Sequence, residues 1–176
     1  MNGSDIAIEI LDEAGWSKVV HIHPLVYPPD NPITKVWAGV QWADADHRFV
    51  LSRRGEPVSH VALHVREGLA NGRPVRIAGI GGVMTHPAMQ GNGYAQRLLR
   101  AALDKAVELH AGFCLLICEE KNVGFYEKQG WRVFPGTMIY QQDGKSLQWT
   151  LSKVMVRDQG RRAPRGGMID LRGLPW

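Results

Sequence analysis

Residues 90–95, Gln-Gly-Asn-Gly-Tyr-Ala, place two glycines directly before a segment with strong helical periodicity. The first turn of a helix leaves amide N–H groups without intrahelical acceptors and carries partial positive charge. Because Gly91 and Gly93 have no side chains, an anionic group could approach those amides closely. The stretch therefore predicts an anion site, and phosphate is the most suitable ligand.

Two common phosphate-binding motifs do not fit this turn. A Walker A loop, GxxxxGK[ST], needs a lysine that the segment lacks, and a Rossmann fingerprint, GxGxxG, needs a glycine where Gln96 stands. The turn also lies in the middle of the chain, whereas a Rossmann turn usually follows the first strand. The residues alone therefore leave a purely structural turn as an alternative.

The same turn resembles the Q/R-x-x-G-x-G/A signature of the GCN5-related N-acetyltransferases (GNAT), which bind the pyrophosphate of acetyl-coenzyme A (acetyl-CoA) there. A second segment, residues 122–131 (NVGFYEKQGW), is similar to that family's helix with a tyrosine before a Gly-aromatic turn. The two motifs stand in the family's order and spacing, and the likeness covers about residues 48–135. It implies an acetyl-CoA-dependent N-acetyltransferase that acts on a primary amine of a small molecule.

The resemblance also implies how the coenzyme would lie. The main-chain N–H of Val83 would point at the thioester carbonyl and stabilise the oxyanion that forms when an amine attacks. Asn122 would bind the pantetheine arm. The implied cofactor-binding residues are Val83, Met84, Thr85, Gln90, Gly91, Asn92, Gly93, Tyr94, Ala95, Asn122 and Tyr126.

Tyr126 is the expected general acid, because the resemblance places its phenol beside the departing sulfur. A phenol pKa of about 10 lies above a thiol pKa of about 8.5, so Tyr126 stays protonated at pH 7 and can donate. On the residues alone, the alternative is a tyrosine that packs a short helix onto a sheet.

The base that accepts the amine's proton has several candidates. In aminoglycoside-modifying relatives a glutamate on the glycine-rich strand acts through water, and Gly81 holds the matching position here. Glu119 and Glu120 follow the next strand, although adjacent acids at a strand end are more often solvated. His86 has a suitable intrinsic pKa but stands in a turn before a proline.

The last residues, IDLRGLPW, resemble the C-terminal segment of aminoglycoside 2′-N-acetyltransferases, whose final Trp carboxylate helps to form the substrate site. The likeness implies that Asp170 and Trp176 contact the acceptor, with Arg172 between them, and makes an aminoglycoside a candidate. Such a polycation needs carboxylates. The aspartates on expected loops are Asp44, Asp46, Asp143, Asp158 and Asp170. In this family the segment before the second strand often shapes the acceptor cleft, and its aromatic residues here are Trp16, Tyr27, Trp37 and Trp42.

The elements that must position these residues follow from periodicity and turn signals. Apolar residues recur at helical spacing from Gly93 to Gly112, which is placed to end the helix. The apolar run 113–118 fits a strand buried on both faces. Together with strand 75–85 they form a βαβ unit, which predicts parallel strands joined right-handedly. The glycines inside strand 75–85 predict a bulge or a close approach of another group.

These patterns predict an α/β (α+β) fold in one domain of residues 1–176. The resemblance adds a GNAT-like mixed, mostly antiparallel sheet with a central splayed parallel strand pair and helices on both faces. The remaining expected elements are strands 6–11, 48–53, 58–67 and 131–134, strands within 138–142 and 147–156, a helix over 32–42 capped by Asn31, and a short helix within 122–130.

Charge and hydrophobicity along the sequence indicate which classes of partner the protein can bind. Much of the net charge of +4 lies in residues 157–167, a basic segment that could bind nucleic acid. No aromatics interleave with its arginines, so a solvated loop is favoured. No apolar run approaches the roughly 18 residues of a membrane span, and residues 1–10 lack the features of a signal peptide. We expect a cytoplasmic protein with a small-molecule amine as substrate, no nucleic-acid or membrane partner, and a possible homodimer.

The two cysteines, Cys114 and Cys118, fall on one face of the expected strand, about 13 Å apart. A disulfide needs Cα atoms within roughly 7 Å, so they do not pair with each other there. Two thiols without histidines at ligand spacing also make a poor zinc site. We expect free, buried cysteines and no metal.

Three alternatives stand beside the acetyltransferase. A transferase for a longer acyl chain would make the same adenine and pantetheine contacts. A non-catalytic CoA-binding or regulatory module could keep the phosphate turn without a base, which Gly81 permits. A nucleic-acid-binding protein using residues 157–167 would lose affinity steeply with salt.

Overall fold

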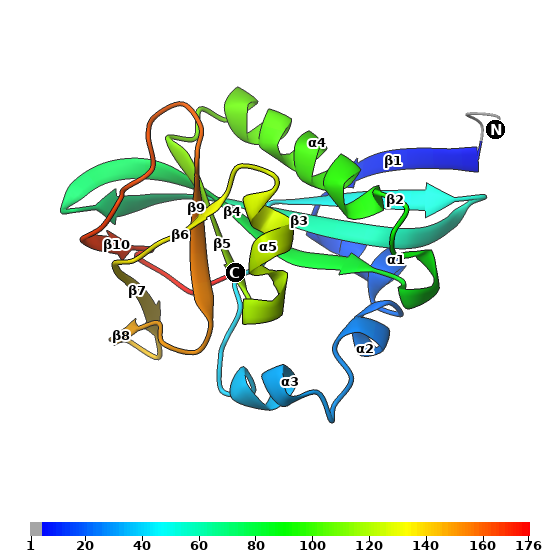
Figure 1. The fold of residues 1–176 in the computed structure, drawn as a ribbon, viewed down its shortest axis with the longest axis horizontal. Coiled ribbons are helices and arrows are strands. Elements are labelled where there is room, and N and C mark those ends of the chain that lie inside the picture. Colours follow the sequence, from blue (N-terminus) through cyan, green and yellow to red (C-terminus); the bar gives the residue numbers. More distant parts are fainter. Residues whose placement is uncertain (1–4) are drawn as a thin grey trace.

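The computed structural model describes residues 5–176, so the first four residues of segment 1–10, which was considered as a possible signal peptide, lie outside the described part. Its strands form one mixed sheet in the order β6-β9-β5-β4-β3-β10-β7-β8, with β2 also on β3 and β1 on β2 (Figure 1). The strands are β1 (Ile6–Leu11), β2 (His47–Arg53), β3 (Glu56–Ala70), β4 (Arg73–Thr85), β5 (Phe113–Cys118), β6 (Arg132–Val133), β7 (Thr137–Gln142), β8 (Lys145–Gln148), β9 (Lys153–Asp158) and β10 (Met168–Asp170).

Helices lie on both faces of this sheet. They are α1 (Trp16–Val19), α2 (His23–Val26), α3 (Pro32–Val36), α4 (Tyr94–Glu108) and α5 (Val123–Glu127), with 3₁₀ turns at Glu13–Gly15, Pro87–Met89 and Glu120–Asn122. Neighbouring residues of β5 show the two faces: Leu116 packs in the cluster of Leu98 from α4, whereas Leu115 packs in that of Trp176. In Figure 1, α4 lies across one side and α1–α3 on the other. The expected fold class is confirmed.

The hairpins turn through residue pairs with positive φ. Arg54-Gly55 connects β2 and β3, and Asn71-Gly72 connects β3 and β4. Asp143-Gly144 does the same for β7 and β8. Two central residues with φ above zero are the geometry that matches the twist of tight hairpins. β3 extends beyond the expected 58–67 because it pairs with β4 along most of its length and with β10 at its end.

The central parallel pair parts after four residues of pairing. β4 and β5 pair from Ile77 with Phe113 to Ile80 with Leu116. Beyond that point β4 stays on β3 as far as Thr85, while β5 continues on β9. The expected parallel strand pair and its splay are therefore present.

A β-bulge follows directly on this point. The register between β3 and β4 shifts between Ala62, which pairs with Gly81, and His60, which pairs with Met84. Two residues of β4, Gly82 and Val83, therefore stand opposite one residue of β3. Gly82 has a φ of 52°, which glycine adopts at little cost. The bulge takes Val83 out of the regular ladder.

The helix expected over residues 32–42 is shorter than predicted. It begins as expected, with Asn31 accepting a hydrogen bond from the Ile33 amide at 3.0 Å, but it ends at Val36. After the helix, the Val40 N–H donates a hydrogen bond to the carbonyl of Trp37 and closes a turn. The Gln41 amide donates to the side chain of Gln142. Contacts with a distant strand thus override helical periodicity here.

The end of α4 also differs from prediction. The residue with positive φ after the helix is His110, at 57°, and not Gly112. Gly112 donates its amide to Arg76, and a Cβ there would lie 2.6 Å from the side chain of Val75. This glycine is therefore required by close packing beside β4 and does not end the helix.

Smaller differences occur near the C-terminus. The expected strand 131–134 is reduced to the two residues of β6, and the strand within 147–156 is divided between β8 and β9. The short helix within 122–130 ends at Glu127. Cys114 and Cys118 are buried and free, as predicted. Within residues 5–176, no helix combines the length and apolar character needed to cross a bilayer.

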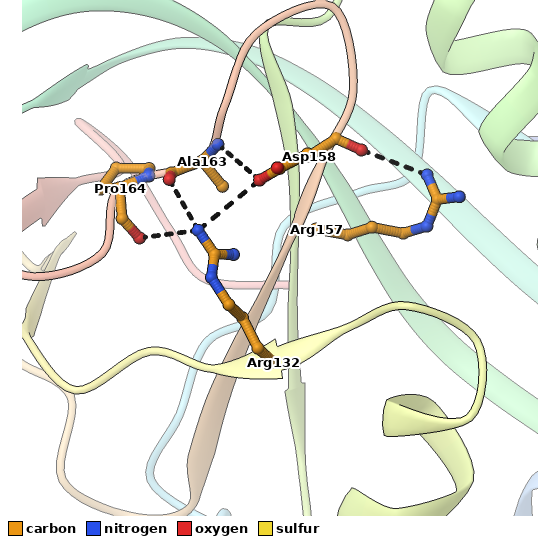
Figure 2. Close-up of polar contacts among 5 residues, drawn as sticks. All are labelled: Arg132, Arg157, Asp158, Ala163 and Pro164. Atoms are coloured by element: carbon orange, nitrogen blue, oxygen red, sulfur yellow. Dashed lines mark hydrogen bonds and ion pairs between the residues drawn. The ribbon is translucent and has the colours of Figure 1, made fainter.

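The basic segment 157–167 begins at the end of β9 and continues as a loop that is braced by Arg132 of β6 and by its own polar groups (Figure 2). Arg132 reaches Asp158 at 3.5 Å and donates to the carbonyls of Ala163 and Pro164 at 2.7 and 3.3 Å. Asp158 also accepts from the Ala163 amide, and its carbonyl accepts from Arg157. These bonds give the loop a defined shape without an external ligand.

Candidate active site

A cleft of about 930 Å³ opens where β4 and β5 part. One wall is the bulged segment 80–84 of β4, and another is residues 117–119 at the end of β5. Tyr126 of α5 and Trp176 also line it, and the segment between β1 and β2 supplies most of its aromatic side chains. The splay of two strands therefore creates a space that reaches into the middle of the sheet.

Tyr126 contributes a buried phenol to this cleft. The residue is 6% exposed, and its ring packs edge-on against Phe125 and Trp131 at 5.0 and 6.3 Å. Its hydroxyl makes no hydrogen bond to another group of residues 5–176. Burial raises the pKa of Tyr126, and neighbouring Tyr27 and Cys118 raise it further, so the phenol stays protonated at neutral pH.

A thiolate formed here would share this environment. Burial, with a smaller contribution from nearby glutamates, raises the pKa of the Cys118 thiol in the same cleft to about 12. Burial likewise raises the pKa of Tyr27 to about 12. Because low polarity disfavours phenolate and thiolate alike, a departing thiolate is also more basic here than in water. The pKa of the phenol and that of the thiol are therefore raised together, and Tyr126 can still donate its proton to the sulfur.

Two buried histidines on β3 were not singled out from the sequence. His60 is 0% and His64 is 6% exposed, and burial lowers the pKa of each to about 4. His60 is bonded through both ring nitrogens, to the Gly82 carbonyl at 2.7 Å and to Arg48 at 3.3 Å. His64 is bonded through Nδ1 alone, to the Asp44 carbonyl at 3.0 Å, and it lines the cleft. Both imidazoles are neutral at pH 7.

Trp176 explains two of the glycines in β4. A Cβ on Gly79 would overlap its indole, and one on Gly81 would lie 3.1 Å from its main-chain carbonyl carbon. The indole donates from Nε1 to the Leu115 carbonyl at 3.2 Å and stacks on His64. The close approach predicted for these glycines is thus made by the chain itself.

The glycine-rich turn presents free amides at the start of α4. Gly91 and Gly93 have φ values of 79° and 74°, and no other atom lies within 4 Å of where a Cβ on Gly91 would stand. The amides of residues 91–93 donate to no group within residues 5–176. The Asn92 side chain holds the turn by donating to the carbonyls of Met89 and Gln90. This arrangement suits a diphosphate, which accepts several amide hydrogen bonds.

The turn adjoins the strand that lines the cleft. Gln90 donates to the carbonyl of Thr85, the last residue of β4, at 3.3 Å. The structure gathers six of the predicted site residues around the cleft: Val83, Met84, Glu119, Asn122, Tyr126 and Trp176. The others lie outside its lining, namely Thr85, Gln90, Gly91, Asn92, Gly93, Tyr94, Ala95, Glu120 and Asp170. An elongated ligand could follow β4 from the turn into the cleft.

The candidate bases are separated by the structure. Glu119 lines the cleft, with its carboxylate 3.0 Å from Lys121. Glu120 forms a surface ion pair with Lys153. His86 accepts a hydrogen bond from the Ala88 amide in the turn after β4. Of the aspartates proposed to meet a cationic acceptor, Asp44 alone lines the cleft. Within residues 5–176, no group of three or more His, Cys, Asp or Glu side chains could hold a metal ion.

Aromatic rings from the segment between β1 and β2 form a continuous wall of the cleft. The rings of Trp16, His23, Tyr27, Trp37 and Trp42 follow one another with centroid distances of 5.8, 5.4, 6.3 and 5.4 Å. The indole N–H of Trp37 is buried and lacks a partner within residues 5–176. We call these five residues the aromatic wall.

Comparison with known proteins places this geometry in context. A family model described as an acetyltransferase (GNAT) domain matches residues 7–134. A GNAT family acetyltransferase from Brucella melitensis in complex with acetyl-CoA has a TM-score of 0.61 and 18% identity, covering 92% of each chain. The Escherichia coli N-acetyltransferase YhbS in complex with CoA has a TM-score of 0.64 and 13% identity, covering 97% of this chain and 95% of that one. A search of curated proteins gave no significant match.

Proposed function

The chain belongs to the acetyltransferase (GNAT) family and is therefore an acetyl-CoA-dependent acyltransferase, and we propose that a primary amine of a small molecule is its acceptor. The observation that supports this most directly is the continuity of the amide turn at 91–93 with the cleft that contains Tyr126. A ligand with a diphosphate at one end and a thioester at the other fits such a path.

Each part of the path has a proposed task. The amides of the turn bind the diphosphate, with the start of α4 adding favourable charge. Asn122 holds the amide-containing arm of the coenzyme in the cleft. The Val83 N–H, displaced from the ladder by the bulge, stabilises the oxyanion. Tyr126 gives its proton to the departing sulfur.

Direct attack by the amine suits this cleft better than an acyl-cysteine intermediate. Cys118 is the cysteine that lines it, and a cysteine attacks as thiolate. Since burial raises the pKa of this thiol to about 12, almost none is ionised at pH 7. The acetyl group would then pass to the acceptor in one displacement at the thioester.

The aromatic wall favours an amine that carries an aromatic or apolar ring. Flat aromatic surfaces bind such a ring by offset or edge-on packing. Glu13, Asp44 and Glu119 lie among the lining residues and attract the ammonium form of the amine, while Arg48 covers Trp16 at 5.0 Å. A lining with more aromatic rings than carboxylates suits an arylalkylamine better than a polycation.

An aminoglycoside is the second candidate acceptor. It is favoured by the position of Trp176 in the cleft, because the C-terminal segment is the part of the sequence that resembles the aminoglycoside 2′-N-acetyltransferases. Asp170 of β10, the other residue expected to contact the acceptor, accepts a hydrogen bond from the Arg172 amide and does not line the cleft.

Gly91→Glu is expected to weaken acetyl-CoA binding at least about tenfold, because it brings a carboxylate to the proposed diphosphate site. Isothermal titration calorimetry measures the change. Gly72→Glu is the matched control, since Gly72 also has positive φ, at 76°, and open space at its Cβ position. Equal affinities of the two variants would contradict the assignment of the turn.

An amine panel tests the acceptor. We expect 2-phenylethylamine to exceed butylamine at least about tenfold in kcat/KM for CoA release, because its ring gains contact area on the aromatic wall. An aminoglycoside with a 2′-amine is the third substrate, and propionyl-CoA in place of acetyl-CoA tests a longer acyl chain. Slow hydrolysis that no amine accelerates would favour a CoA-binding module instead.

A further inference from the structure

We propose that His64 is the base that accepts the proton of the acceptor amine, with Nε2 as the accepting atom. This role rests on the acetyltransferase function proposed above. The other candidate bases are less suitable, because Gly81 has no side chain, neither Glu120 nor His86 lines the cleft, and Glu119 is paired with Lys121.

The hydrogen bond at Nδ1 fixes the tautomer of His64. Its partner is the main-chain carbonyl of Asp44, at 3.0 Å, and a carbonyl oxygen only accepts hydrogen bonds. The proton of the neutral ring therefore sits on Nδ1, and Nε2 carries the lone pair. Within residues 5–176, Nε2 has no hydrogen-bond partner.

The position of Nε2 suits a base at the cleft. It lies 3.3 Å from where a Cβ on Gly81 would stand, which places it against the segment 80–84 that lines the cleft. Stacking on Trp176, with ring planes 17° apart and centroids 5.8 Å apart, holds the imidazole in this orientation. The absence of a side chain at Gly81 lets Nε2 of His64 and the main chain of Trp176 both lie against the strand that presents Val83.

His60 shows what a structural histidine on the same strand looks like. Both of its nitrogens are bonded, Nδ1 to the Gly82 carbonyl and Nε2 to Arg48, and it does not line the cleft. Glu119, the acid at the cleft, is held by Lys121 at 3.0 Å. His64 therefore combines a free lone pair with a place in the lining.

Burial and two nearby arginines keep His64 neutral. Burial is the main cause that lowers its pKa to about 4, and the positive charges of Arg48 and Arg66 lower it further, while the Asp44 carbonyl and Asp46 act in the opposite direction. The main-chain carbonyl carbon of Trp176 lies on the Gly81 side. The folded-state pKa lies below the ordinary 6.5, so the base form is present at neutral pH and is lost only as pH falls through about 4.

The proposed step moves one proton through the cleft. The ammonium form of the amine first loses a proton to solvent. The lone pair of the free amine then forms the C–N bond, the carbonyl pair moves onto oxygen, and the nitrogen becomes cationic and much more acidic than a free ammonium. His64 Nε2 takes that proton. The oxygen pair then reforms the carbonyl, the C–S bond breaks, and sulfur takes the proton of Tyr126. Water returns the proton from His64 to Tyr126, which balances the reaction.

His64→Asn tests the role, because its amide can still donate to the Asp44 carbonyl but lacks the second nitrogen. We expect kcat to fall about a hundredfold at pH 7 with the Kd for acetyl-CoA unchanged. The deficit is expected to shrink as pH rises, because hydroxide from the solvent then removes the proton of the cationic nitrogen in place of His64. In His64→Ala, added imidazole is expected to restore part of the rate.

His60→Asn is the matched control, and it should keep the shape of the wild-type pH–rate profile whatever its stability. Thermal unfolding checks that each variant is folded. The role of His64 would be overturned if His64→Asn kept the shape of the wild-type pH–rate profile, so that its rate deficit was the same at every pH. It would also be overturned if imidazole did not raise the rate of His64→Ala. Neither result would contradict the acetyltransferase function. Wild-type protein that binds acetyl-CoA but releases no thiol with any amine would overturn the acetyltransferase proposal as well.

Discussion

Tyr126→Phe is expected to lower kcat for amine acetylation about a hundredfold while leaving the affinity for acetyl-CoA within about twofold of wild type. The substitution removes a hydroxyl that makes no hydrogen bond to residues 5–176, so neither fold nor packing depends on it. The departing thiolate then leaves without a donor, in surroundings that raise its basicity. Steady-state kinetics with a thiol-reactive dye measure the change.

Two further tyrosines make this test specific. Tyr140→Phe is the control, because Tyr140 is as buried as Tyr126, at 7% exposed, and lies outside the cleft. It should keep wild-type kinetics. Tyr27 is the other phenol in the lining, and its pKa is also raised, to about 12. If Tyr27→Phe lost activity while Tyr126→Phe kept it, the proton donor would be Tyr27.

The parts of the site formed by contiguous residues were accessible from the sequence. The glycine turn and α4 are a local unit, in which φ above zero, a free helix start and helical periodicity all appear within one segment. The parallel pair also follows locally, because a strand, a helix and a buried strand in succession restrict the connection to one handedness. Its splay came from the family resemblance and is present in the register.

His64 could not be recognised in the same way. Its role depends on the Asp44 carbonyl, on Trp176 and on the bulge in β4, and these come together only in the folded chain. One signal was present: Gly79 and Gly81 alternate on a strand beside Ala62 and His64 of its partner. Small residues around a histidine indicate that its ring faces a close neighbour or a space.

The shortened α3 also depends on contacts between distant residues, which the sequence pattern does not reveal. Residues beyond Val36 keep an apolar helical period, yet Trp37 turns into the aromatic wall and the Gln41 amide bonds to Gln142. Helical propensity is a weak preference that such contacts override. The predicted role of Gly112 as the end of the helix is wrong for a related reason. Gly112 lacks a side chain because Val75, on another strand, packs against it.

Gly79→Ala is expected to lower the free energy of unfolding by about 3 kcal/mol, because its Cβ would overlap the indole of Trp176. Trp176 is 5% exposed, so displacement costs its burial, the stack on His64 and the hydrogen bond to Leu115. Urea unfolding measures the change as a lower midpoint at constant slope. Gly39→Ala is the control, since Gly39 has open space and no positive φ.

A double-mutant cycle separates this clash from a general cost in the strand. In Trp176→Ala the indole is gone, so adding Gly79→Ala should cost less than about 1 kcal/mol, giving a coupling of about 2 kcal/mol between the two positions. A Gly79→Ala protein as stable as wild type, or equal costs in both backgrounds, would contradict the placement of Trp176 over β4. Because the same indole stacks on His64, we expect Gly79→Ala also to lose amine-dependent turnover at temperatures where it remains folded.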